Sequence, residues 1–320
     1  MTEGKPFIED LHQHFPVQKE PPINTMNKKL VVSIASPGWL STQQNPHIPT
    51  SHEAMAQALI DSVHQGAAIV HMHAREEGGK PSEDPDVTQK ILDRVLNVCP
   101  DVVTSTHINA DKTKSGVDMF SKWLERITAT GVKYIQGTPL HTKGSTNKRS
   151  AMWDDQLLRD VIPYLEDKGV KPELLIYDTF GIDRVAKAIE QAARWKPYWV
   201  VLNFGKHDAM PVGRDPWAHY HVMTMIKMTR EMLPEETVLG AYIGGRNWLP
   251  LTVLAIMMGI DIVRVGVEDC LWVYPHRDEI IQSDADMVRK IVTIGRELGR
   301  EIATPDDVRT ILGLKKPAKS

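Results

Sequence analysis

Eight short runs rich in β-branched residues alternate with eight longer amphipathic stretches along this chain of 320 residues. Such alternation is typical of βα units that build a parallel sheet covered by helices. The predicted strands span 30–35, 67–73, 102–106, 134–137, 174–178, 199–204, 238–242 and 262–267. The predicted helices lie near 51–65, 84–98, 115–130, 154–168, 183–195, 215–232, 248–258 and 284–298, with Ser51, Asp84 and Ser115 as N-caps.

Eight βα repeats over about 270 residues have the size of a (β/α)8 TIM barrel, whose functional groups lie at the carboxyl ends of the strands. A doubly wound open sheet is the alternative fold. It is expected to carry a GxGxxG phosphate loop after its first strand, and the stretch from Ser33 to Trp39 lacks this spacing. We therefore predict an α/β TIM barrel over 28–320, preceded by an irregular arm over 1–27 with four prolines among mixed charges.

The composition narrows the class of partner. The chain is 42% hydrophobic and 25% charged, with a net charge of -3 and scattered basic residues. We therefore expect a small-molecule partner and neither nucleic acid nor a membrane. Two cysteines are too few for a disulfide framework, no apolar run approaches ~18 residues, and a signal-peptide pattern is missing. These features predict a cytoplasmic protein.

Two histidines mark the end of the second predicted strand. His71 and His73 are two residues apart, so their side chains point to the same face of the strand and can share one metal ion. The alternative is a pair of ordinary polar histidines. A catalytic zinc site usually takes three protein ligands and leaves a fourth position open, so an acid is expected at another strand end.

The eighth predicted strand supplies that acid. Alternation places Arg264, Gly266 and Glu268 on one face, so an arginine and a glutamate point into the barrel mouth. Asp269, one residue past the strand, can act as a general base beside the cation of Arg264. The alternative is a buried Arg264–Glu268 ion pair that only braces the barrel.

These motifs carry a family resemblance. The run His71-Met72-His73-Ala74-Arg75 and the run Arg264-Val265-Gly266-Val267-Glu268-Asp269 resemble the β-keto acid cleavage enzymes, whose best-known members cleave 3-keto-5-aminohexanoate. Further matching residues are Pro81, Asp84-Pro85, Gly295-Arg296 and 303–306. The resemblance extends from about Leu30 to Leu314. The combination of HxHxR and RxGxED is specific, whereas either motif alone is weak.

The resemblance implies a TIM barrel that binds one Zn²⁺ through His71, His73 and Glu268, with Asp269 and Arg264 as the base dyad. It also implies a reaction in which a β-keto acid and acetyl-CoA, the co-substrate, give acetoacetate and a new acyl-CoA thioester. The chain would assemble as a homo-oligomer, commonly a tetramer.

The resemblance also suggests substrate-binding hydroxyl groups. The best matches are Ser105 at the end of the third predicted strand and Thr138 after the fourth, and Thr106 is a further candidate. Ordinary capping and turn roles are the alternative for such residues.

Two positions depart from the family pattern. Aminohexanoate-cleaving members carry a glutamate after the first strand, where this chain has Ser36-Pro37-Gly38-Trp39, so the substrate is expected to differ from 3-keto-5-aminohexanoate. Trp39 either faces an apolar or quaternary ammonium substrate tail or packs under the following loop. His107, where glycine is common, is either a pocket residue or an exposed loop residue.

Two other functions stay open at this point. One is a zinc hydrolase or class II aldolase-like lyase that works without CoA. The other is a barrel that binds a metal or ligand without catalysis.

Overall fold

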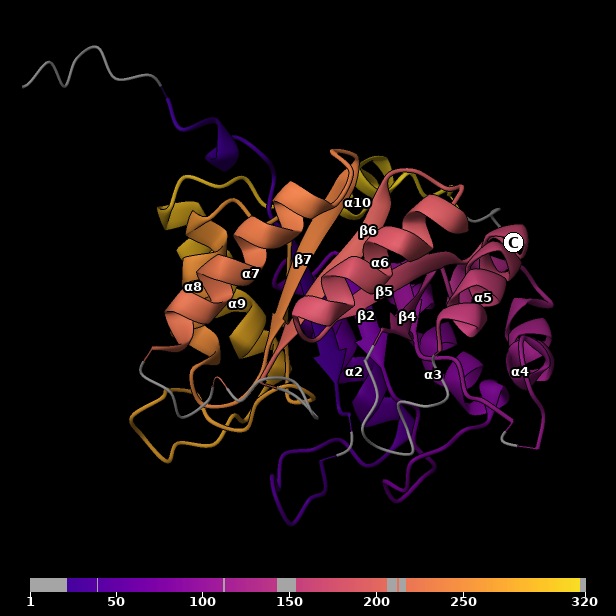
Figure 1. The fold of residues 1–320 in the computed structure, drawn as a ribbon. Coiled ribbons are helices and arrows are strands. Elements are labelled where there is room, and N and C mark those ends of the chain that lie inside the picture. The colour runs from indigo at the N-terminus through magenta and orange to yellow at the C-terminus, as the bar shows by residue number, and fades with distance from the viewer. Residues whose placement is uncertain are drawn as a thin grey trace, which may run out of the picture.

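A computed structural model describes residues 22–38, 40–111, 113–142, 154–205, 212 and 217–316. Eight parallel strands close into a barrel in chain order, and helices surround it (Figure 1). This confirms the predicted TIM barrel. The strands are β1 (Val31–Ser36), β2 (Ile69–Met72), β3 (Val103–Thr106), β4 (Gly137–His141), β5 (Lys171–Ile176), β6 (Tyr198–Phe204), β7 (Thr237–Ile243) and β8 (Ile262–Val265). The principal helices are α2 (His52–His64), α3 (Pro85–Val98), α4 (Asp118–Thr128), α5 (Asp155–Asp167), α6 (Thr179–Gln191), α7 (Ala218–Met232), α8 (Trp248–Met257), α9 (Asp284–Glu297) and α10 (Pro305–Leu312).

Each strand is buried on both faces, because one face lines the barrel interior and the other packs against helices. In β8 the side chains that face the interior are clearly distinct from those that face the helices. Ile262 belongs to the interior cluster, whereas Val263 and Val265 belong to the cluster under the helices. Trp199 fills much of the interior, and a Cβ at Gly137 would lie 2.4 Å from its ring. The barrel is therefore a packed core that opens only at its ends.

The closing seam of the barrel brings distant parts of the chain together. β1 pairs with β8 on one side and with β2 on the other, so Ser33 lies beside Arg264 and Ala35 lies beside His71. Strand β1 therefore separates the two motifs by one strand width, about 4.8 Å on each side. Side chains from the ends of β2 and β8 can meet across it.

Element boundaries differ from the prediction in the middle of the chain. Strand β4 shares only Gly137 with the predicted strand 134–137, and 132–134 form the 3-10 helix η3 (Val132–Tyr134). Strand β5 and helix α6 begin earlier than predicted, at Lys171 and Thr179. Glycine and proline in β4 lower its strand propensity, and packing against Trp199 outweighs that preference.

The helix ends also test the predicted caps. The side chains of Ser51 and Asp84 accept hydrogen bonds from the first turns of α2 and α3, as predicted, but Ser115 does not cap α4, which follows Val117. Helix α10 was not predicted, although Thr304 and Asp307 form a capping box at its start. This helix covers the end of the barrel where the strands begin (Figure 1).

The predicted irregular arm falls largely on residues 1–21, outside the described residues. Just after them, η2 (Asn24–Met26) forms one short 3-10 turn. None of the helices in the described part of the chain combines the length and the apolar character needed to cross a bilayer.

A buried lysine lies at the start of β5, on the inner face of the barrel. Lys171 is 1% exposed, its Nζ donates to the carbonyl oxygen of Trp195 at 3.1 Å, and the ammonium lies 4.5 Å from the centre of the Trp195 ring. Burial lowers the pKa of this amine to about 7, although Glu166 opposes the shift. The protonated amine therefore destabilises the folded state.

Replacing Lys171 with methionine is expected to stabilise the protein at low pH. Because the folded pKa lies near 7 and the unfolded value near 10.5, the unfolded chain binds more protons between these limits and wild-type stability rises with pH across them. Lys171→Met should be more stable by about 1–4 kcal/mol near pH 6, with a smaller difference near pH 9, in urea unfolding. Lys187→Met, at a side chain 58% exposed, should show no such difference. A less stable Lys171→Met at pH 6 would contradict this account.

Candidate metal centre and catalytic pocket

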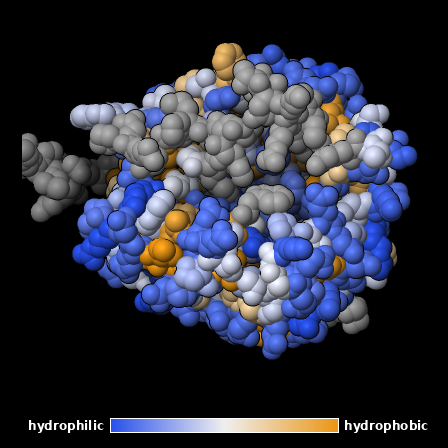
Figure 2. Space-filling view, turned by 90° about the horizontal axis from the view of Figure 1, so that it is seen from below, coloured by the Kyte–Doolittle hydropathy of each residue, from blue (hydrophilic) through white to orange (hydrophobic). Residues whose placement is uncertain are grey.

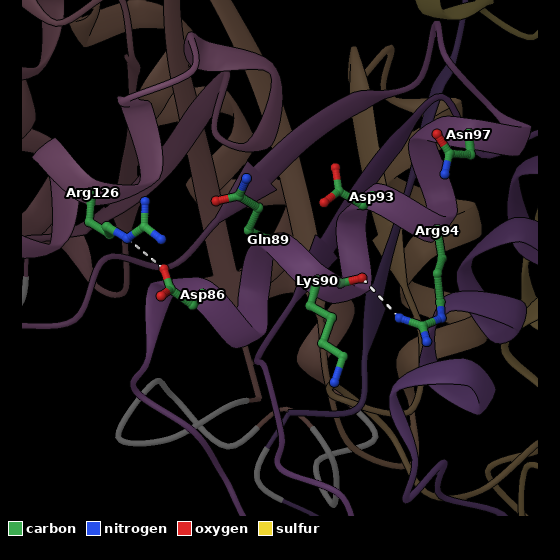
Figure 3. A pocket seen from close by; sticks show the side chains of 7 residues that line it. All are labelled: Asp86, Gln89, Lys90, Asp93, Arg94, Asn97 and Arg126. Atoms are coloured by element: carbon green, nitrogen blue, oxygen red, sulfur yellow. Dashed lines mark hydrogen bonds and ion pairs between the residues drawn. The ribbon is translucent and has the colours of Figure 1, made fainter.

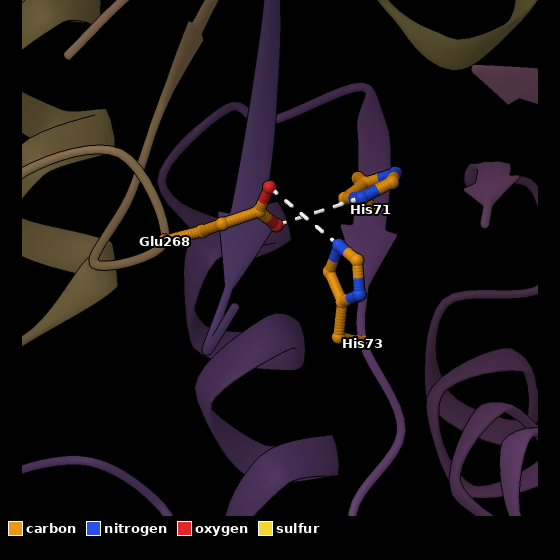
Figure 4. Close-up of side chains that lie close together, drawn as sticks. All are labelled: His71, His73 and Glu268. Atoms are coloured by element: carbon orange, nitrogen blue, oxygen red, sulfur yellow. Dashed lines mark ion pairs between the residues drawn. The ribbon is translucent and has the colours of Figure 1, made fainter. Parts of the chain in front are cut away.

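Three potential ligands meet at the mouth of the barrel. His71 in β2 and His73 just after it present their Nε2 atoms to the carboxylate of Glu268, at 3.5 and 3.7 Å (Figure 4). The donor atoms of the three residues all lie within 4.8 Å of one another. Their side chains are 3%, 16% and 7% exposed, respectively. The structure thus brings together the three predicted ligands.

The donor set has the chemistry of a metal centre. Two imidazole nitrogens and one carboxylate, with space for a further ligand, are the donors of several catalytic zinc sites. Burial strengthens such a site, because water competes less well for the ligands. The residues present therefore fit a divalent transition metal.

Close backbone approach fixes the position of Glu268. Gly38, in the loop after β1, has a φ of +62°, and a Cβ there would lie 2.3 Å from Cγ of Glu268. Gly266 has a φ of +135°, and a Cβ there would lie 2.1 Å from the carbonyl oxygen of Ala35. Only glycine fits either position without displacing its neighbour. The loop after β1 therefore lies directly against the third ligand.

Arg75 secures this loop from the neighbouring strand end. Its guanidinium donates to the carbonyl oxygens of Gly38 at 2.8 Å, Leu40 at 2.5 Å and Gly79 at 3.1 Å, and the residue is 3% exposed. Burial lowers the pKa of Arg75 from its ordinary value. The arginine of the HxHxR motif thus supports the Gly38 loop, which in turn contacts Glu268.

Arg264 holds the second carboxylate of the motif in place. It donates from Nε and Nη2 to the two oxygens of Asp269, at 3.0 and 2.9 Å, and from Nη2 to Glu268 at 3.1 Å. Its guanidinium also lies 4.2 Å from the centre of the Tyr242 ring. Although burial opposes the charge, Asp269 and Glu268 hold the pKa of Arg264 above its ordinary value. Asp269 is therefore a fixed carboxylate next to the ligand Glu268.

A third acid lies deeper in the barrel and was not predicted. Glu173 is 1% exposed and accepts hydrogen bonds from Ser105, at 2.9 Å, and from Tyr242. Burial raises the pKa of Glu173, although these hydrogen bonds and Arg264 oppose the shift. The signal was available, since an acid two residues before Leu175 shares its inward face, but the predicted strand began too late to include it.

Two further histidines continue the site along the strand ends. The ring of His107, after β3, stacks on His73 at 5.3 Å, and the ring of His141, at the end of β4, lies 6.0 Å from that of His107. Tyr177 follows after β5, with its ring 5.7 Å from His141. His107 is thus a pocket residue, which is one of the two roles left open by the sequence. His141 and Tyr177 were not predicted.

The predicted substrate-binding residues lie on different faces of their strands. Ser105 lies on the inner face of β3, bonded to Glu173. Thr106 points to the outer face and donates to the carbonyl oxygen of Tyr134 at 2.8 Å. Thr138 is inside β4, and alternation with Gly137, which faces Trp199, puts it on the outer face toward the helices. Neither threonine lines the mouth. Trp39 lies outside the described residues.

The described surface of the face onto which the strands end is predominantly hydrophilic (Figure 2). A separate cleft of about 460 Å³ lies on the outer side of the barrel between α3 and α4 (Figure 3). Asp86, Lys90, Arg94 and Arg126 are among its lining residues, and Asp86 pairs with Arg126 at 2.7 Å. This cleft includes none of the metal-ligand candidates, so the strand-end site is the stronger candidate.

The fold and the site define a (β/α)8 barrel with a candidate metal centre and a fixed carboxylate at the carboxyl ends of its strands. Residues 29–314 match the profile of the β-keto acid cleavage enzymes, and the chain belongs to this family. It is therefore an enzyme of the β-keto acid cleavage type, as the sequence motifs predicted.

Individual relatives agree with this membership. The chain is 29% identical to a 3-keto-5-aminohexanoate cleavage enzyme of Fusobacterium nucleatum, over 91% of this chain and 100% of that one. It is 24% identical to a 3,5-dioxohexanoate:acetyl-CoA acetone transferase of Paraburkholderia graminis, over 92% and 98%. Among solved structures, ObcA in complex with a C4-CoA adduct and oxalate has a TM-score of 0.67 at 18% identity, over 84% of this chain and 68% of that one. This last likeness supports the fold alone.

Proposed function

We propose that this enzyme is a zinc-dependent acyltransferase that converts a β-keto acid and acetyl-CoA into acetoacetate and a new acyl-CoA thioester. The observation that carries the proposal is the convergence of His71, His73 and Glu268 beside the carboxylate of Asp269. Family membership supports it, and so does the acetyl-CoA in the name of the Paraburkholderia graminis relative. The proposal extends to the homotetramer that the motifs imply.

His71, His73 and Glu268 would hold the zinc ion. When bound, Zn²⁺ would act as a Lewis acid that polarises the ketone of the β-keto acid and makes its C2 proton more acidic.

Asp269 is the group that we assign to proton transfer. It is adjacent to Glu268 and accepts two hydrogen bonds from Arg264, which orient the carboxylate. The carboxylate would take the proton from C2, and C2 would then attack the acetyl carbonyl of acetyl-CoA and expel the CoA thiolate. The thiolate would add to the former ketone carbon, and the C2–C3 bond would break. The resulting carbanion at C2 would take the proton back from Asp269 and leave as acetoacetate.

The side chains in the loop after β1 indicate which substrates the enzyme accepts. In the described part of this loop, Ser36, Pro37 and Gly38 offer no acid to pair with an ammonium group. A cationic tail would be desolvated there without a counter-charge. We therefore propose a substrate other than 3-keto-5-aminohexanoate.

Turnover of β-keto acids is expected to require acetyl-CoA. The zinc-loaded protein, incubated with cationic, anionic and apolar β-keto acids, should release acetoacetate only when acetyl-CoA is present, and should prefer a non-cationic acid. Acetoacetate is measured with a coupled dehydrogenase assay. Consumption of the β-keto acid without acetyl-CoA would instead support the hydrolase or lyase, and a strong preference for 3-keto-5-aminohexanoate would refute the assignment of the β1 loop.

Asp269→Asn is expected to lower kcat by about 10²–10⁴-fold, because the amide cannot accept the C2 proton. Zinc content, measured by mass spectrometry, should stay at the wild-type level, since the three ligands are unchanged. Asp278→Asn, at a side chain 89% exposed, should retain wild-type kcat. An Asp269→Asn variant with wild-type kcat would remove Asp269 from the proton-transfer step.

Gly38→Ala is expected to weaken zinc binding more than about 10-fold, because the new methyl group must displace Glu268. The matched control is Gly116→Ala. Gly116 has a φ of +60°, close to that of Gly38, but no atom lies within 4 Å of its added Cβ. Both variants carry the same backbone strain, about 1–2 kcal/mol, so a difference in zinc affinity reports displacement of the ligand. Equal zinc affinities in a competition titration would show that the loop does not constrain Glu268.

A further inference from the structure

The far side of the barrel mouth from Asp269 is lined by ring side chains. His107 connects the candidate ligand His73 to His141, because its ring contacts both at 5.3 and 6.0 Å. Strand β4 ends at His141, whose side chain shares the inner face with Gly137. His107 and then His141 therefore follow the candidate ligand His73 along the strand ends.

The orientation of His141 is set by a buried tyrosine. Nδ1 of His141 lies 2.5 Å from the hydroxyl oxygen of Tyr177, which is 4% exposed. Burial raises the pKa of Tyr177 far above its ordinary value, so the hydroxyl keeps its proton. The Asn203 side chain makes a hydrogen bond to Tyr177, and its Oδ1 accepts no hydrogen bond among the described residues, so the amide N–H is the donor. With the Asn203 amide donating to its oxygen, Tyr177 directs its own proton to Nδ1 of His141.

This arrangement determines the tautomer of His141. A neutral imidazole whose Nδ1 accepts a hydrogen bond carries its proton on Nε2. The other nitrogen is then a donor and cannot accept. A donor at this position favours an oxygen atom and disfavours both a methylene group and an ammonium group.

We propose that His141 is a specificity-determining residue, which donates a hydrogen bond from Nε2 to an oxygen atom in the tail of the β-keto acid. Tails with a keto or carboxylate oxygen are then preferred to apolar or ammonium tails of equal length. This inference rests on the proposed function, because it takes the keto acid end of the substrate to lie at His71, His73 and Glu268.

Three six-carbon β-keto acids test the inference: 3,5-dioxohexanoate, 3-oxohexanoate and 3-keto-5-aminohexanoate. Their dissociation constants from the zinc-loaded protein without acetyl-CoA are measured by calorimetry, and kcat/KM is measured with acetyl-CoA. Wild type should favour the dioxo acid over both others by about 10-fold or more. His141→Phe should abolish this preference while changing the values for 3-oxohexanoate by less than about 3-fold.

Tyr177→Phe tests the orienting hydrogen bond to His141 separately from the contact between His141 and the substrate tail. It leaves the imidazole in place but removes the proton directed at Nδ1, so the preference should fall by less than it does in His141→Phe. In ¹⁵N spectra, His141 should be the Nε2–H tautomer in wild type and a mixture in Tyr177→Phe. His276→Phe, at an exposed histidine, should keep the wild-type preference.

Other outcomes overturn either the inference or the proposed function on which it rests. An unchanged preference in His141→Phe, or a wild-type preference for 3-oxohexanoate, would exclude the hydrogen bond to the tail. A raised KM for acetyl-CoA in His141→Phe with an unchanged preference would assign the donor to the thioester instead. If the three acids bind as expected but none reacts with acetyl-CoA, the proposed function fails and the role of His141 in binding stands.

Discussion

The buried guanidinium of Arg264 is the interaction on which the site depends. A charged group inside a barrel is destabilising unless charged partners surround it, and Arg264 has Asp269 and Glu268 within hydrogen-bond distance. The guanidinium also lies over the ring of Tyr242, whose hydroxyl group donates a hydrogen bond to Glu173. Removing the arginine would leave two buried carboxylates side by side. The positions of Asp269, the proposed base, and of Glu268, a proposed metal ligand, therefore depend on one cation.

Among the described residues at the barrel mouth, acidic side chains outnumber the arginine that they surround. Glu268, Asp269 and Glu173 are three acids around one arginine, and burial favours the neutral form of Glu173. Histidines that bind a metal are neutral, so they would add no positive charge here. The negative charge of Glu268 and Asp269 together is then greater than the positive charge of Arg264. A divalent ion at the three donors offsets this excess. Electrostatics therefore support the same proposal as the identity of the donors.

The parts of the site that were predictable lie where strand alternation is unambiguous. His71 lies in β2 and Arg264 in β8, each within an apolar run, so their inward facing could be inferred directly from alternation. His73, Glu268 and Asp269 lie just past the ends of these strands. Thr138 shows the limit of this reasoning. Its strand begins at Gly137, and a strand boundary placed a few residues away leaves the facing of each side chain undetermined.

Residues such as Glu173 and His141 were missed for the same physical reason. Their strands contain proline, glycine or charged residues, which lower local strand propensity. Both are strands because their neighbours in the closed barrel supply hydrogen bonds and packing that no local window contains. The sequence thus predicts the half with the proposed metal ligands and base better than the half that faces it.

The two halves of the mouth also differ in what constrains them. Around β8, β1 and β2, close contacts at Gly38 and Gly266 and the hydrogen bonds of Arg264 leave little freedom for Glu268 and Asp269. Around β3, β4 and β5, the mouth is lined by side-chain rings whose partners are other side chains, as with His141 and Tyr177. Substitutions there can alter shape and hydrogen bonding without moving Glu268 or Asp269. A barrel arranged this way can change its substrate on one side while keeping one reaction on the other.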